Sequence, residues 1–205
     1  MKKQKYYAVR KGKEAGIYLT WDQCKEQVHG IKGAQYKSFE SRQEAENYLE
    51  GSSFSKLVHK DNIDSDHLVA YVDGSYNKED HSFSYGVVLL GHEIEEELSE
   101  RFIDPEMSLM RNVSGELYGS MKAMERALEL GKKKIYIHYD YAGIEYWAKG
   151  EWKRNKAGTI RYKEYYDSIK DKIEVVFIKV PAHAGIEGNE RADKLAKEAI
   201  QKEEQ

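Results

Sequence analysis

Residues 68–75 have the sequence Leu68-Val69-Ala70-Tyr71-Val72-Asp73-Gly74-Ser75. Five mostly apolar residues in a row are typical of a buried strand, and the glycine and serine that follow indicate a sharp turn. A carboxylate at the end of such a strand is costly to remove from water unless a cation meets it. The stretch therefore predicts a buried strand that delivers Asp73 to a cation site.

Three more carboxylates fit the same site. Asp140 follows the apolar run Ile135-Tyr136-Ile137-His138-Tyr139, and Glu116 and Asp193 lie at helical spacing from apolar residues. Carboxylate oxygens suit Mg²⁺ or Mn²⁺. Two such ions about 4 Å apart can activate a water and stabilise the leaving oxygen in a displacement at phosphorus. The residues alone leave a second interpretation open, in which these are four ordinary surface acids among the 36 in the chain.

From residue 68 onward the pattern predicts an α/β domain with a mixed five-stranded sheet and helices on both faces. We expect strands at 68–72, 85–90, 95–102, 135–139 and 173–180, the first three forming a meander, and helices at 112–130, 141–149, 159–169 and 187–200. In such sheets, sites form beyond the carboxyl ends of the parallel strands, which is where Asp73 and Asp140 are predicted to lie.

A small ββαβα module precedes this domain. We expect its strands at 5–10, 17–20 and 36–39, one helix from Trp21, and a second from Ser41, which has capping-box spacing, to about residue 50. Residues 52–66 are polar and without periodicity. We therefore predict domains at 1–51 and 67–205 with a linker at 52–66.

Charge is distributed unevenly between the two parts. Residues 1–39 hold nine basic and three acidic residues, a net charge of +6, whereas the remaining 24 basic and 33 acidic residues give −9. A basic module joined to an acidic body indicates that the module binds a polyanion. A solvated, lysine-rich surface is the alternative.

Composition places the chain among globular proteins. Hydrophobic residues make up 40% and charged residues 34%, which supplies a core and a soluble surface. The single Cys24 excludes an internal disulfide framework and fits a reducing compartment. The basic start has no apolar signal-peptide core, and no stretch reaches the ~20 apolar residues of a membrane helix. We expect a monomer in the cytoplasm.

The chain resembles type 1 ribonuclease H with an N-terminal hybrid-binding (viroplasmin-like) domain. The catalytic resemblance rests on Tyr71-Val72-Asp73-Gly74-Ser75, Asn112-Val113-Ser114-Gly115-Glu116-Leu117, Tyr139-Asp140, Val180-Pro181-Ala182-His183-Ala184-Gly185 and Asn189-Glu190-Arg191-Ala192-Asp193, in the family's order. The N-terminal resemblance rests on Tyr6-Tyr7-Ala8-Val9-Arg10, Gly16-Ile17-Tyr18, Thr20-Trp21 and Tyr36-Lys37-Ser38-Phe39.

This resemblance implies a role for each matching residue. Asp73, Glu116, Asp140 and Asp193 would bind two Mg²⁺ ions, with Mn²⁺ as a possible substitute. His183 would be the histidine of a mobile loop that assists water activation or product release, and imidazole chemistry suits that role. A lone loop histidine without such a role is the alternative.

The resemblance also implies contacts with an RNA–DNA hybrid. Asn112 and Asn77 would contact substrate near the active site, and Tyr7, Trp21 and Lys37 would hold the hybrid on the N-terminal module. An amide can donate to and accept from a 2′-hydroxyl. For Asn77 we favour a turn role, and for Trp21 a place in the small core is the alternative.

One motif departs from the family. Ser commonly follows the third acid, whereas Tyr141 follows Asp140 here, so substrate contacts from residues 141–143 cannot be carried over. The basic protrusion of some relatives is not obvious either. The basic, aromatic segment 147–163, with Trp147 and Trp152, either replaces it in part or is a solvated helix pair with core tryptophans.

The implied activity is a Mg²⁺-dependent endonuclease that cuts the RNA strand of RNA–DNA hybrids and leaves 5′-phosphate and 3′-hydroxyl ends. A hybrid-binding protein without catalysis is a second possibility, against which the complete acid set argues. Another nuclease or a transposase on the same sheet is a third, against which the hybrid-binding module argues.

Overall fold

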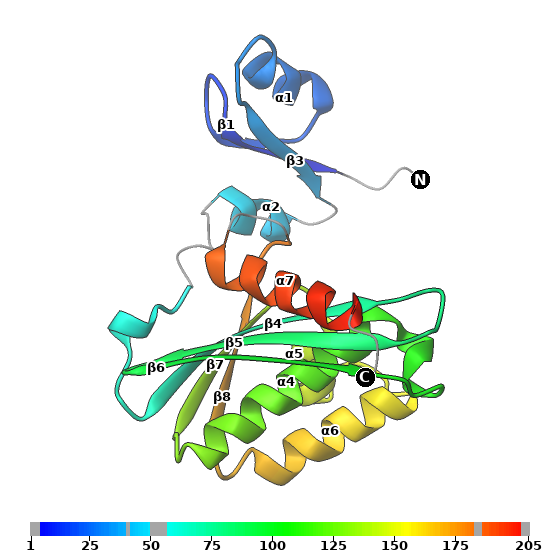
Figure 1. Cartoon of the computed structure of the whole chain (residues 1–205). Coiled ribbons are helices and arrows are strands. Elements are labelled where there is room, and N and C mark those ends of the chain that lie inside the picture. The colour runs from blue at the N-terminus through cyan, green and yellow to red at the C-terminus, as the bar shows by residue number, and fades with distance from the viewer. Residues whose placement is uncertain (1–4, 40–41, 50–56, 183–185, 202–205) are drawn as a thin grey trace. The chain divides into compact units, whose positions relative to one another are not determined.

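The computed structural model describes residues 5–39, 42–49, 57–182 and 186–201. The chain divides into two compact units between residues 56 and 57 (Figure 1). Among the described residues, no helix is both long and apolar enough to cross a membrane.

The first unit is a three-stranded antiparallel sheet with two helices. Its elements are β1 (Tyr6–Lys11), β2 (Gly16–Tyr18), α1 (Trp21–Val28), β3 (Gln35–Phe39) and α2 (Arg42–Leu49). β1 is the central strand, in the order β2-β1-β3. Helix α1 begins after Thr20, whose hydroxyl accepts a hydrogen bond from the Gln23 amide at 3.3 Å. The predicted ββαβα order is confirmed; the Ser41 cap lies outside the described residues.

The second unit contains a mixed five-stranded sheet. Its elements are η1 (Lys60–Asn62), β4 (His67–Tyr76), β5 (Phe83–Gly91), β6 (Ile94–Phe102), η2 (Met107–Met110), α4 (Asn112–Glu129), β7 (Lys134–Tyr139), α5 (Gly143–Lys149), α6 (Ala157–Ile169), β8 (Glu174–Lys179) and α7 (Glu187–Gln201). The strand order is β6-β5-β4-β7-β8. β4, β5 and β6 form the predicted antiparallel meander, and β4, β7 and β8 run parallel.

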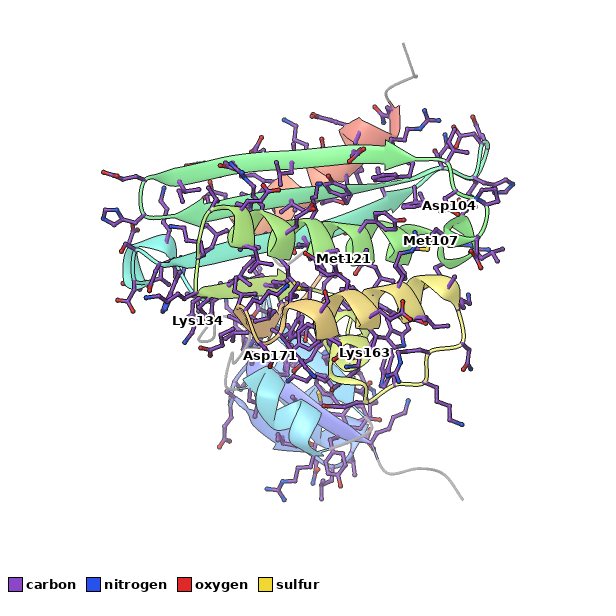
Figure 2. All side chains as sticks on the ribbon, turned by 90° about the horizontal axis from the view of Figure 1, so that it is seen from below. Asp104, Met107, Met121, Lys134, Lys163 and Asp171 are labelled. Atoms are coloured by element: carbon purple, nitrogen blue, oxygen red, sulfur yellow. The ribbon has the colours of Figure 1, made fainter. Side chains whose placement is uncertain are left out.

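Helices cover both faces of this sheet, as predicted. Leu68 and Ala70 of β4 pack into a core with α4, α5 and α6, whereas Val69 and Tyr71, the alternate residues of the same strand, pack on the side of α7. Figure 2 shows α4 and α6 side by side across one face, with Met121 on α4 and Lys163 on α6. A strand that is apolar at every position is therefore buried on both sides.

Two boundaries differ from expectation. β4 continues past Asp73 to Tyr76, because its antiparallel pairing with β5 persists to Tyr76↔Phe83 although its pairing with β7 ends at Tyr71↔His138. Of the expected linker 52–66, residues 52–56 lie outside the described part. The apolar side chains Leu57, Val58 and Ile63 pack against the core on the α7 side, so that stretch belongs to the second unit.

Candidate metal centre

The parallel register of β4 and β7 brings two aspartates to the same end of the sheet. Tyr71 lies opposite His138, and Asp73 and Asp140 each follow two residues later. Because side chains alternate along a strand, a shift of two residues keeps both aspartates on one side of their strands. Beyond this point β4 pairs only with β5, so the carboxylates meet where the parallel ladder stops.

A close contact between two glycines delivers Glu116 to the same place. A Cβ atom on Gly74 would lie 2.6 Å from the Glu116 amide nitrogen, and one on Gly115 would lie 2.9 Å from the Gly74 Cα. A side chain at either position would push α4 away from β4. The absence of both side chains is what allows the first turns of the helix to approach the strand that carries Asp73.

Ligand oxygens of Asp73, Glu116 and Asp140 lie within 4.8 Å of one another. Burial raises the pKa of Asp73 to about 7, with further contributions from the charges of Asp140 and Asp193, although the Gly74 amide donates to its Oδ1 at 2.7 Å. Burial, followed by the charges of Asp140 and Asp73, raises the pKa of Glu116 well above its ordinary value. The three groups repel one another as anions.

The donor set fits a divalent cation with oxygen ligands. Glu116 is only 3% exposed, and its Oε2 is buried without a hydrogen-bond partner among the described residues. An unpartnered, buried carboxylate oxygen is costly, and a cation would offset both its desolvation and the repulsion from its neighbours. Asp73, Glu116 and Asp140 are therefore the residues that could hold such an ion.

Asp193 reaches the site from α7 but is not part of the three-residue cluster. It is close enough for its charge to raise the pKa of Asp73, and its Oδ2 accepts from Lys197 Nζ at 2.7 Å. A third close approach places this helix: a Cβ on Gly86 would lie 2.6 Å from the Ala196 amide nitrogen. Since Gly86 pairs with Asp73 across the strands, α7 packs directly beside that aspartate.

A stacked aromatic pair, which was not predicted from the sequence, lies two residues before the aspartates on the same two strands. The rings of Tyr71 and His138 are 4.4 Å apart at 18°. The His138 Nε2 accepts from the Val58 amide at 3.3 Å, so Nδ1 carries the proton and donates to the Ala70 carbonyl at 3.2 Å. Burial lowers the pKa of His138 to about 4, which keeps the ring neutral. The strand register that pairs these rings was the only available signal for the contact.

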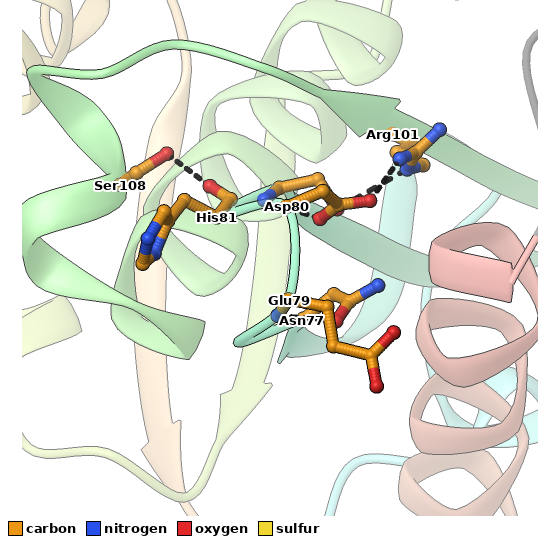
Figure 3. A network of polar contacts seen from close by, with 7 residues as sticks. Asn77, Glu79, Asp80, His81, Arg101 and Ser108 are labelled. Carbon is orange, nitrogen blue, oxygen red and sulfur yellow. Dashed lines mark hydrogen bonds and ion pairs between the residues drawn. The ribbon is translucent and has the colours of Figure 1, made fainter.

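The two predicted asparagines have different surroundings. Asn112 begins α4 and its Nδ2 donates to Glu116 Oε1 at 3.3 Å, which places it beside the cluster. Asn77 forms a turn, in which its Oδ1 accepts from the Glu79 amide at 2.9 Å. Figure 3 shows this hairpin, with Asp80 paired to Arg101 and the His81 carbonyl accepting from Ser108. The turn role favoured for Asn77 is present.

Of the three predicted contacts of the first unit, Trp21 and Lys37 are exposed, whereas Tyr7 is half-buried and packs against the core of Val9, Cys24 and Val28. Trp21 is 43% exposed, which excludes the alternative of a core tryptophan. Its ring lies 5.9 Å from that of Tyr7 and 5.7 Å from that of Tyr36. Lys37 is exposed on the neighbouring strand β3, with its ammonium 5.7 Å from the Phe39 ring centroid. The unit therefore carries an aromatic cluster of Tyr7, Trp21 and Tyr36, and Lys37, the residue after Tyr36 on β3, is exposed on the opposite side of that strand.

The remaining predictions concern His183 and the segment that follows Asp140. His183 lies outside the described residues. Tyr141 is half-buried, with its ring 5.7 Å from Trp147 and 6.4 Å from Trp152. Trp147 is buried, as the helix-pair interpretation expects, and its indole N–H donates to the Lys153 carbonyl at 3.2 Å, whereas Trp152 is 37% exposed.

A second set of possible ligands lies at the other end of β4. Ligand atoms of Asp64, Asp66 and His67 also fall within 4.8 Å of one another. Asp66 is already paired with Lys133 at 2.8 Å, and Asp64 is exposed. This cluster is therefore compensated by a lysine and lacks the buried, unpartnered oxygen of the first.

Each of the two units matches a known protein family. Residues 5–49 match the ribonuclease H1 N-terminal domain, and residues 65–201 match the RNase H domain. Ribonuclease H1 from Homo sapiens is 22% identical over 276 aligned residues, which span 97% of this chain and 90% of that protein.

Two solved structures share the fold of the second unit. RNase H1 from the archaeon Halobacterium salinarum NRC-1 has a TM-score of 0.55 at 24% identity, over 65% of this chain and 97% of the other. LC11-RNase H1, solved in complex with an RNA/DNA hybrid, has a TM-score of 0.53 at 21% identity, over 65% of this chain and 96% of the other.

Proposed function

The chain belongs to the ribonuclease H family, and on this premise we propose that it is an endonuclease that hydrolyses the RNA strand of RNA–DNA hybrids. The products are 5′-phosphate and 3′-hydroxyl ends. One observation carries the proposal: three carboxylates from two strand ends and a helix lie within 4.8 Å of one another in a chain whose residues 65–201 match this family.

Asp73, Glu116, Asp140 and Asp193 would hold two Mg²⁺ ions, or Mn²⁺ in their place. When bound, such ions supply an activated water and stabilise the leaving oxygen in a displacement at phosphorus. The protein's contribution is placement. Glycine contacts set the distance from α4 to β4 and from α7 to β5. The raised pKa of Asp73 means that this residue gives up a proton when a cation binds.

Substrate contacts are proposed on both units. Asn112, beside Glu116, has an amide that can both donate to and accept from a ribose 2′-hydroxyl. On the first unit, Trp21 and Tyr7 would lie against the sugar of one strand and Lys37 would pair with phosphate. This substrate class is supported by LC11-RNase H1, which was solved in complex with an RNA/DNA hybrid. We propose that the protein is cytoplasmic, because its single cysteine fits a reducing compartment, and that it acts as a monomer.

The test offers the purified full chain RNA–DNA hybrid, double-stranded DNA and double-stranded RNA, each with Mg²⁺ or with chelator. We expect cleavage of the hybrid only, in its RNA strand and only with Mg²⁺. Asp140→Asn should lower that rate by at least ~10³-fold while hybrid affinity stays within about twofold, because the carboxylate acts on metal and not on binding. Binding without cleavage would leave a hybrid-binding protein, and cutting of duplex DNA would favour a different nuclease.

A further inference from the structure

The edge strand β6 carries three consecutive glutamates, and its alternation sends them to opposite faces of the sheet. Glu96 pairs with Arg126 of α4, at 2.8 Å to Nε and 2.9 Å to Nη2. Glu95 and Glu97 pair instead with Arg191 of α7. Figure 1 shows these two helices on opposite faces of the sheet. The strand thus holds one arginine from each side.

The Arg191 contact uses all three guanidinium nitrogens. Its Nη1 lies 2.8 Å from Glu95 Oε1, and its Nε and Nη2 lie 3.0 and 2.7 Å from Glu97 Oε1. Lys60 is a second cation on Glu95, at 3.5 Å from Oε2. A planar guanidinium bound at several points resists rotation, unlike a single ion pair.

The position of Arg191 gives this geometry a consequence. It stands two residues before Asp193 on α7, and Ala192 between them lies against Gly86 of β5. Ser84, also on β5, donates from its hydroxyl to the Ala196 carbonyl at 2.7 Å. Contacts with β5 fix the distance between α7 and the sheet. The contacts of Arg191 with β6 oppose rotation of the helix about its axis. The orientation of the helix sets where the Asp193 carboxylate points.

We propose that Arg191 is a positioning residue for the metal centre, whose contacts with Glu95 and Glu97 orient α7 so that Asp193 faces Asp73. This inference rests on the proposed function in one respect, that Asp193 is a metal ligand. The glutamates are about half exposed, at 49% and 44%, so the ion pairs add little to global stability. Their consequence is orientation, which separates this role from ordinary protection of an edge strand by charge.

The experiment compares Arg191→Met with Arg126→Met in the full chain. Both substitutions remove an arginine that pairs with the same strand, but Arg126 lies on α4, ten residues after Glu116. Mn²⁺ binding is measured by titration calorimetry without nucleic acid. Arg191→Met should raise the Mn²⁺ dissociation constant about 3- to 10-fold, and Arg126→Met should leave it unchanged. Hybrid affinity in chelator should not change in either variant.

Two further variants separate positioning from a general loss of structure. The double variant Glu95→Gln/Glu97→Gln should reproduce the effect of Arg191→Met by a second route. In an Asp193→Asn background, Arg191→Met should have no further effect on Mn²⁺ binding, because its influence passes through that carboxylate.

An unchanged Mn²⁺ dissociation constant in Arg191→Met, an equal rise in Arg126→Met, or the same rise in the Asp193→Asn background would each overturn the role of Arg191. Because calorimetry reports metal binding without turnover, a wild-type protein that binds Mn²⁺ but cleaves no hybrid would refute the proposed function and still decide this inference.

Discussion

Glu116 is placed to bind a metal ion, but its burial lowers the stability of the folded chain when no ion is bound. It is nearly fully buried beside two other acids, and one of its oxygens has no hydrogen-bond partner among the described residues. Removing a carboxylate from water without a partner favours its neutral form, which is why its pKa is raised. The metal-free chain therefore carries an energetic cost at this site that a bound cation would remove.

The raised pKa of Asp73 makes the free energy of unfolding depend on pH. Its folded-state pKa of about 7 lies above the ordinary value of 3.8, so between these values the folded chain holds a proton that the unfolded chain has lost. The contribution of Asp73 to the free energy of unfolding is therefore complete below pH ~4 and is lost as the pH rises to ~7.

In chelator at pH 8, Asp73→Asn should therefore be more stable than the wild type, by about 1 kcal/mol after allowance for solvent screening, or about 2–4 °C in melting temperature. At pH 4 the difference should vanish. Mg²⁺ should raise the melting temperature of the wild type more than that of the variant. Thermal melts at the two pH values, with and without Mg²⁺, provide the measurement, and a variant less stable than wild type at pH 8 would contradict the expectation.

At the scale of elements, three glycines set the distances between the sheet and two helices. Gly74 and Gly115 let α4 approach β4, and Gly86 lets α7 approach β5. A cluster of carboxylates needs its backbones close together because aspartate and glutamate side chains are short. The glycines are therefore part of the site although they offer no ligand.

Gly86→Ala tests this directly. The added methyl would lie 2.6 Å from the Ala196 amide nitrogen and 2.9 Å from the Leu195 Cβ, so α7 has to shift. We expect a loss of about 1–3 kcal/mol in the free energy of unfolding, and a higher Mg²⁺ requirement for cleavage because Asp193 moves with the helix. Gly91→Ala on the same strand is the control, since its nearest neighbour is the end of the Leu68 side chain at 3.1 Å. Equal effects from the two substitutions would show that α7 does not depend on Gly86.

The elements were largely predictable from the sequence, whereas their contacts were not. Apolar runs identified four of the five strands of the larger sheet, the charged segment 95–102 was predicted as the third strand of the meander, and helical spacing identified α4 and α7. The extension of β4 to Tyr76 was missed because Gly74 and Ser75 indicate a turn, yet pairing with β5 holds them in the strand. The contacts of Arg191 with Glu95 and Glu97, and the stacking of Tyr71 on His138, join residues far apart in sequence, and they follow only once the strand order and register are known.

At the scale of the whole molecule, charge and aromatic surface divide between the two units. The first unit, residues 1–56, has 11 basic and 7 acidic residues and a net charge of +4, and the second, residues 57–205, has 22 and 29 and a net charge of −7. The acidic cluster lies in the second unit, and an aromatic cluster of the exposed Trp21 and Tyr36 with the half-buried Tyr7 lies in the first. A negatively charged catalytic unit attracts a polyanion weakly, so we assign the retention of substrate to the basic unit.

This division predicts that Trp21→Ala acts on binding and not on chemistry. Loss of one aromatic contact with nucleic acid costs about 1–3 kcal/mol, so hybrid affinity in chelator should fall about tenfold. The single-turnover cleavage rate at saturating enzyme should change less than twofold, because the carboxylates lie in the other unit. Trp21→Phe, which keeps an aromatic face, should retain most of the affinity. Lys37→Ala should make hybrid affinity depend less steeply on salt concentration, since one fewer phosphate contact releases fewer counterions on binding. If Trp21→Ala slowed single-turnover cleavage as much as it weakened binding, the tryptophan would have to act on the chemical step, and the division between the two units would be wrong.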